Sequence, residues 1–126
     1  TFYLGQKSME KLQGVHPDLV NVVKLALLKS PVDFTVIEGL RSLERQKELV
    51  AAGASRTLNS RHLTGHAVDL AAVVGKEIRW DWPLYSKIAD AMKEAGVELK
   101  VNIQWGGDWK TFKDGPHFQL HPKFYK

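Results

Sequence analysis

The sequence predicts an α+β domain in which a small, mainly antiparallel sheet is flanked by about three helices. Apolar residues recur at helical spacing in some segments, and in others they alternate or run together as they do in strands. Helical segments come first and are followed by strands that one further helix interrupts. Because 126 residues leave room for one hydrophobic core, we expect a single domain over residues 1–126.

The helices are predicted from apolar residues three or four positions apart, bounded by capping residues, prolines or glycines. They are a short turn over 8–12 and helices over 17–30, 42–52 and 83–96. In the segment 42–52 we expect Leu43, Leu49 and Val50 to face the core. Gly96 is expected to end the last helix.

The strands are predicted from short apolar or alternating runs beside turn residues. They cover 34–37, 67–73, 76–80, 101–105 and 117–121. The segment 67–73 alternates and then runs apolar, which is typical of a central strand, whereas 76–80 is expected at an edge. The polar, turn-rich segment 54–65 is predicted to be a loop.

Composition excludes several classes of protein. Apolar residues make up 44% of the chain, and no run approaches the roughly 18 apolar residues of a membrane-spanning helix. The absence of cysteine excludes disulfides, thiolate metal sites and a cysteine nucleophile. The net charge is +4, but lysine and arginine are dispersed, so we expect no nucleic-acid partner. The first residues lack the features of a secretory signal, which predicts a cytoplasmic protein until it is released.

Two segments carry residues that suit chemistry. In the strand 67–73, Asp69 shares a face with alanines, where an ionised carboxylate needs a metal or another partner. Pairing with an arginine, or capping of a turn, is an equally good interpretation of Asp69 alone. In the strand 117–121, His117 and Gln119 share a face, and a Gly-Pro turn can fold Asp114 back beside His117.

Two histidines and one carboxylate are typical ligands of a catalytic zinc ion, whose fourth position holds water. The sequence therefore predicts that His62, Asp69 and His117 bind Zn²⁺ and that Asp114 is the general base. A zincin helix is excluded, because Leu63 stands where its glutamate is required and a glycine follows two residues later.

Three segments, in chain order, resemble one family. The pattern Ser60-x-His62-x-x-Gly65-x-Ala67-x-Asp69 is similar to the signature of the zinc peptidases that include VanX, VanY and the phage L-alanyl-D-glutamate endopeptidases. The block 105–119 resembles the phage branch. Gly39-Leu40-Arg41-Ser42 and Gln46 stand where these enzymes carry a Gly-aromatic-Arg-Ser turn and a glutamine, although Leu40 replaces the aromatic residue. The resemblance covers about residues 34–120.

The resemblance implies the same zinc ligands, with Asp114 as acid and base and Arg41 as the catalytic arginine that stabilises an oxyanion or orients the substrate. A salt bridge at a helix start is the alternative for Arg41. Substrate contacts are expected from four residues: Ser60, Gln46, Trp109 and Gln119. For Ser60, closing the loop is equally possible. Trp105 is expected in the core, and Trp80 and Trp82 are expected to pack.

The implied activity is hydrolysis of the L-Ala–D-Glu bond in peptidoglycan stem peptides by a monomeric phage endolysin. It implies no nucleic-acid partner, no stable membrane association and no separate wall-binding domain. Such an enzyme waits in the host cytoplasm without a signal peptide and reaches the wall once the membrane is permeabilised. The alternatives are a D-Ala–D-Ala carboxypeptidase or dipeptidase with the same site, which an aspartate at position 114 disfavours, and a non-catalytic wall-binding module.

Overall fold

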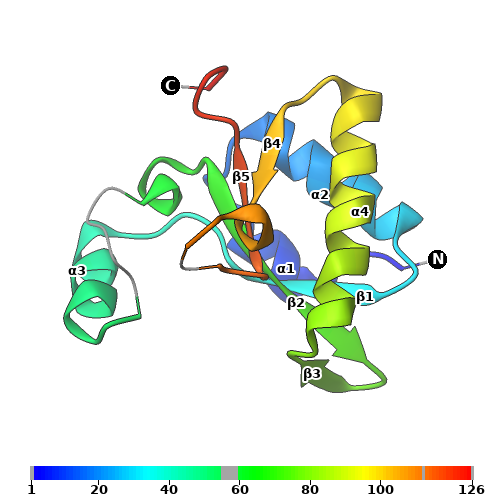
Figure 1. The fold of residues 1–126 in the computed structure, drawn as a ribbon, viewed down its shortest axis with the longest axis horizontal. Helices are drawn as coiled ribbons and strands as arrows, with labels where there is room; N and C mark the ends of the chain where they lie inside the picture. Colours follow the sequence, from blue (N-terminus) through cyan, green and yellow to red (C-terminus); the bar gives the residue numbers. More distant parts are fainter. Residues whose placement is uncertain (1, 55–59, 112, 126) are drawn as a thin grey trace.

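The computed structural model describes residues 2–54, 60–111 and 113–125 of the chain (Figure 1). Within these residues the helices are α1 (Gln6–Lys11), α2 (Pro17–Lys29), α3 (Leu43–Ala51) and α4 (Trp82–Leu99), with 3₁₀ turns η1 (Arg61–Thr64) and η2 (Gly106–Asp108). The strands are β1 (Asp33–Glu38), β2 (Ala67–Val74), β3 (Glu77–Arg79), β4 (Ile103–Trp105) and β5 (His117–Leu120). The predicted α+β class with a small antiparallel sheet is confirmed.

The central strand of the sheet is β2, as predicted. The strands lie in the order β1-β2-β5-β4, and every pair is antiparallel. β1 pairs along one edge of β2. Along the opposite edge, β5 pairs with the first half of β2 and β3 pairs with its last residues. Register places Asp69 of β2 opposite His117 of β5, so two predicted ligands are cross-strand neighbours.

The hydrophobic core lies between the sheet and the packed pair α2 and α4, whereas α3 stands apart from them (Figure 1). Strand residues that alternate with Asp69 and His117 are fully buried in this core: Val68, Leu70, Phe118 and Leu120. Alternation therefore divides β2 and β5 into an apolar face toward the helices and a second face that carries the polar residues.

The structure corrects three expectations. In α3 the buried residue is Gln46, and Leu43 is 51% exposed because this helix does not pack on the main core. The last helix continues through Gly96, where a side chain would meet the carbonyl of Val101, and ends at Leu99, followed by Lys100 in the left-handed conformation. The strand expected over 101–105 begins only at Ile103. Trp80 and Trp82 pack against Tyr85 and Trp105, as expected, although they are 59% and 46% exposed.

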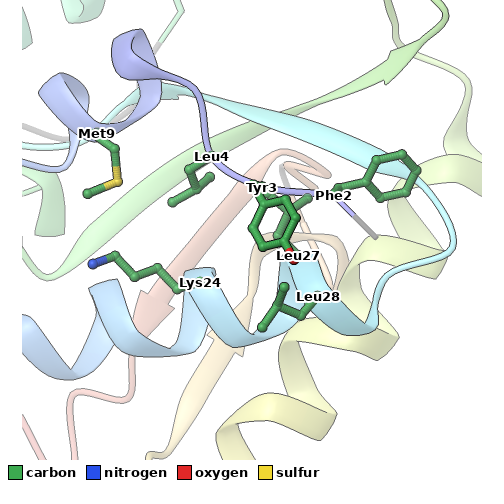
Figure 2. A pocket seen from close by; sticks show the side chains of 7 residues that line it. All are labelled: Phe2, Tyr3, Leu4, Met9, Lys24, Leu27 and Leu28. Atoms are coloured by element: carbon green, nitrogen blue, oxygen red, sulfur yellow. The ribbon is translucent and has the colours of Figure 1, made fainter.

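The N-terminal segment lies over α2 and leaves an apolar groove of about 340 Å³ (Figure 2). Side chains from the segment, from α1 and from α2 line it: Phe2, Tyr3, Leu4, Met9, Lys24, Leu27 and Leu28. None of the predicted site residues lines this groove. Among the described residues, no helix combines the length and the apolar character that crossing a bilayer requires.

Adjacent leucines of α2 test this assignment of the core. Leu27 is 1% exposed and Leu28 is 47% exposed, so Leu27→Ala should lower the free energy of unfolding by about 2–5 kcal/mol. Leu28→Ala is the matched control, and we expect it to cost less than about 1 kcal/mol. Urea denaturation followed by circular dichroism measures both. Equal losses in the two variants would contradict the packing of α2.

Candidate active site

His62 is held in place by the short turn η1. The Ser60 hydroxyl accepts a hydrogen bond from the His62 backbone N–H at 3.2 Å and caps the turn. Gly65 ends it with a φ of 74°, and a Cβ there would lie 2.3 Å from the Gly14 carbonyl oxygen. A glycine is therefore required at this position for both conformation and space.

The three predicted metal ligands come together. Asp69 Oδ1 lies 3.3 Å from His62 Nε2 and 3.3 Å from His117 Nδ1. One ligand atom from each residue falls within 4.8 Å of the others, a separation that a single ion can bridge. His62 and His117 are buried, and the Asp69 side chain is 16% exposed. Residues far apart in the sequence thus form one compact donor set.

Both imidazoles use their outer nitrogen for a second hydrogen bond. His62 Nδ1 lies 2.9 Å from the Gly39 carbonyl oxygen, which can only accept. His117 Nε2 lies 2.8 Å from Gln119 Oε1, and the Gln119 amide in turn donates to Gln104 Oε1 at 2.9 Å. Because these partners accept, each imidazole can keep a proton on its outer nitrogen and, when a metal binds, offer His62 Nε2 or His117 Nδ1 to it in place of the hydrogen bond to Asp69.

The electrostatics of the cluster favour positive charge at its centre. Burial opposes ionisation of Asp69, but its hydrogen bonds with His117 and His62 hold the pKa of this carboxyl well below its usual range. Burial disfavours the charged form of His117, yet the hydrogen bond with Asp69 raises the pKa of this imidazole. Two imidazoles and one carboxylate, each imidazole with its outer nitrogen already hydrogen-bonded, are a donor set that could hold a metal ion.

Arg41 lies against the same carboxylate. Its guanidinium donates to both carboxylate oxygens of Glu38 at 2.7 Å and to Gln46 Oε1 at 2.7 Å. Its Nη2 is 3.5 Å from Asp69 Oδ2, the oxygen that His62 and His117 do not share. The salt bridge considered for Arg41 is therefore present, and it holds the arginine beside Asp69. Sequence reasoning missed Glu38, because a spacing of three residues indicates an ion pair on a helix, and Glu38 is the last residue of a strand.

Asp114 lies in the turn that leads into β5. A Cβ on Gly106 would lie 2.3 Å from the Asp114 carbonyl oxygen and 3.1 Å from His117 Cβ, so the glycine lets these segments approach closely. The backbone N–H of His117 donates to the Asp114 carbonyl at 3.2 Å. Burial raises the pKa of the half-buried Asp114 carboxyl, and the negative charge of Asp69 raises it further. A raised pKa suits a proton-transferring group.

The residues expected to contact substrate differ in exposure. Ser60 is half-buried at the start of η1, and Trp109 is half-buried with its ring centroid 5.1 Å from that of His117. Gln46 and Gln119 are buried. Gln46 accepts a hydrogen bond from Arg41, and Gln119 bonds His117 and Gln104. Substrate binding by these four residues stays a prediction, and for the two glutamines the structure shows a supporting contact instead.

Trp105 and the two glycines that follow it pack closely against the turn that carries Asp114. Trp105 is buried, as predicted, and its indole N–H donates to the Gly115 carbonyl at 2.6 Å. A Cβ on Gly107 would lie 2.3 Å from the Trp105 ring. The Gly-Gly pair therefore lets the Trp105 ring and the Asp114 turn lie against η2.

Gln104 is the second residue that sequence reasoning missed, since an amide in a short edge strand carries no distinctive signal.

Comparisons with known proteins show which family the chain resembles. The sequence model of the family described as phage L-alanyl-D-glutamate peptidase matches residues 1–121. The L-alanyl-D-glutamate peptidase of Escherichia phage T5 is 33% identical over 118 residues, which cover 90% of this chain and 86% of that protein. Peptidoglycan L-alanyl-D-glutamate endopeptidase CwlK of Bacillus subtilis is 30% identical over 115 residues, with 81% and 69% covered.

Solved structures extend the comparison. The crystal structure of the Serratia marcescens L-Ala D-Glu endopeptidase ChiX superposes with a TM-score of 0.93 at 53% identity, covering 98% of this chain and 93% of that one. The vancomycin-resistance D,D-dipeptidase VanXYg shares the fold, with a TM-score of 0.55 at 23% identity over 84% of this chain and 50% of that one. The chain belongs to the family of phage L-alanyl-D-glutamate peptidases.

Proposed function

We propose that the protein is a zinc-dependent endopeptidase that hydrolyses the L-Ala–D-Glu bond of peptidoglycan stem peptides. The observation that carries this proposal is the sharing of one Asp69 oxygen by two imidazoles whose outer nitrogens are already bonded. The substrate class is supported by the named activities of the T5, CwlK and ChiX proteins. The same activity in an infected host would weaken the wall after the membrane is permeabilised and cause lysis.

Each residue of the site has a role in this reaction. When bound by His62, Asp69 and His117, zinc supplies Lewis-acid chemistry and acidifies water. Asp114 accepts the proton of the attacking water and later delivers it to the amine of the departing D-Glu. Arg41, held by Glu38 and Gln46, keeps positive charge beside Asp69 and offsets the negative charge that develops on the scissile carbonyl oxygen.

Around this centre, two kinds of side chain serve the substrate. Trp109 and Ser60 are partly exposed near the metal ligands, and in this proposal they contact the substrate directly. Gln46 and Gln119 act through Arg41 and His117, which they orient. A monomer is sufficient for the proposed reaction, because each residue assigned a role lies within one chain.

Loss of one ligand tests the metal site. Purified wild-type protein should retain about one zinc per chain after dialysis, and His117→Ala should lose it because two ligands rarely hold zinc. His121→Ala, four residues further along the chain and just past β5, is the matched control and should keep the metal. Zinc at about 100 times its Kd should stabilise the wild type by about 2.7 kcal/mol. Elemental analysis measures the first result and thermal unfolding the second; stoichiometric zinc in His117→Ala would contradict the ligand assignment.

The bond that is cut is tested by mass spectrometry of purified peptidoglycan after digestion, with a chelator-treated sample as the control. We expect fragments with a free amine on D-Glu and with L-Ala retained on muramic acid. Release of a terminal D-Ala would instead assign the protein to the D-Ala–D-Ala branch with the same site. If the wall remains intact in the presence of zinc, the site is structural and the protein is a binding module.

Replacement of Asp114 tests the proton transfer. Asp114→Asn should keep zinc and lower kcat by about 10²–10⁴-fold, because an amide cannot accept the proton. Asp108→Asn is the matched control: Asp108 is exposed and pairs with Lys93 at 2.7 Å. Its rate should stay near that of the wild type. A wild-type rate in Asp114→Asn would remove Asp114 as the base.

A further inference from the structure

Two exposed tryptophans lie where β3 leads into α4. Trp80 is 59% exposed and Trp82 is 46% exposed. The Trp80 ring stacks on Tyr85, with centroids 6.0 Å apart and an interplanar angle of 4°. Large aromatic side chains that gather on a surface are typical of binding sites. Trp80 and Trp82, with Tyr85 beneath, are named here the aromatic platform.

The platform rests on a rigid base. Tyr85 is 2% exposed, and its hydroxyl accepts a hydrogen bond from the Ala72 N–H at 3.1 Å and donates to the Arg79 carbonyl at 2.8 Å. The hydroxyl thereby joins the central strand β2 to the end of β3. A ring fixed at both its hydroxyl and its backbone presents Trp80 in one orientation, which lowers the entropy that binding costs.

The platform adjoins the candidate active site. A Cβ on Gly115 would lie 3.3 Å from the Trp82 ring and 3.6 Å from Tyr85, so the side chains of Trp82 and Tyr85 lie close to this residue. Gly115 follows Asp114, the proposed base, and lies two residues before the ligand His117. The Trp82 ring also lies 5.8 Å from that of Trp105, whose indole N–H holds the Gly115 carbonyl. The aromatic surface is therefore continuous with the turn that carries the base.

The charge beside the platform is balanced. Arg79 and Asp81, which flank Trp80, form an ion pair at 2.9 Å, and both are about half exposed. An anionic polymer would find no unpaired cation in this pair. The negative face of an indole ring attracts polarised C–H groups, and the flat face of a pyranose ring presents a set of them. The chemistry of the platform therefore suits a saccharide.

We propose that Trp80 and Trp82 bind the glycan strand of peptidoglycan by stacking on a saccharide ring next to the stem peptide. This inference rests on the proposed function, in which L-Ala is joined to muramic acid, so that a sugar ring lies one residue from the bond that is cut. The platform then places the substrate through its glycan while the metal site acts on the peptide. The glycan strand determines affinity, and the stem peptide determines where the cut falls.

Binding to glycan alone tests the platform without any turnover. Isothermal titration with a peptide-free oligomer of N-acetylglucosamine and N-acetylmuramic acid should give about a three- to tenfold weaker Kd for Trp80→Ala than for the wild type. Trp80→Phe keeps an aromatic face and should retain most of the affinity. Tyr3→Ala is the matched control, because Tyr3 is an exposed aromatic residue over α2 and should bind as the wild type does.

Kinetics then connect the platform to the reaction. For a stem peptide that carries its disaccharide, Trp80→Ala should raise KM about three- to tenfold and leave kcat unchanged. For the free stem peptide neither constant should change. Equal glycan affinity in Trp80→Ala and the wild type would overturn the proposal, as would equal KM changes for both substrates. Trp80-dependent binding of teichoic acid in place of glycan would also overturn it. The titration result holds even if the L-Ala–D-Glu bond proves not to be the one cut.

Discussion

Asp69 projects from the central strand among alanines, where little water is present to solvate its negative charge. Such a charge is stable only when cationic or hydrogen-bonding groups surround it, and here His62, His117 and Arg41 converge on its two oxygens. Each of these three side chains also hydrogen-bonds a second partner on its far side. His62 bonds a backbone carbonyl, His117 bonds a pair of glutamines, and Arg41 bonds a glutamate. The site is therefore a set of nested contacts around one carboxylate, in which the side chains farthest from the centre fix the orientation of those that touch it.

The fold supplies this convergence because β2 has a partner on each side. β1 leads directly to the turn that carries Arg41, β5 begins with His117, and the turn η1, which holds His62, ends three residues before β2 begins at Ala67. Alternation along β2 and β5 buries apolar side chains against α2 and α4 on one face and gathers the polar groups on the other. The close approach of backbones at Gly65 and Gly106 completes the arrangement. Stability and chemistry thus use opposite faces of the same two strands, which lets the site carry polar groups without interrupting the core.

Much of this could be predicted from the sequence, because strand alternation assigns side chains to faces. It placed Asp69 among alanines and His117 beside Gln119, each on the face opposite the large apolar residues of its strand, before any tertiary contact was known. The cluster with His62 followed from the ligand types that zinc prefers. Glu38 and Gln104 could not be found in this way, since their roles come from partners that only the folded chain brings near. In α3, Leu49 and Val50 are half-buried on the predicted inward side, but Leu43 is exposed and the buried Gln46 was missed. The contact of Gln46 is a hydrogen bond from Arg41, and hydrophobic periodicity does not report such a contact.

The central claim is that the two imidazoles and Asp69 bind one zinc ion. The most direct test is zinc X-ray absorption spectroscopy of the purified protein loaded with one equivalent of zinc. The account predicts a first shell of nitrogen and oxygen atoms at about 2.0–2.2 Å, with the outer-shell scattering of two imidazole rings. A spectrum that shows a single imidazole, or a shell of oxygen atoms alone, would contradict the assignment of His62, Asp69 and His117 as the ligands.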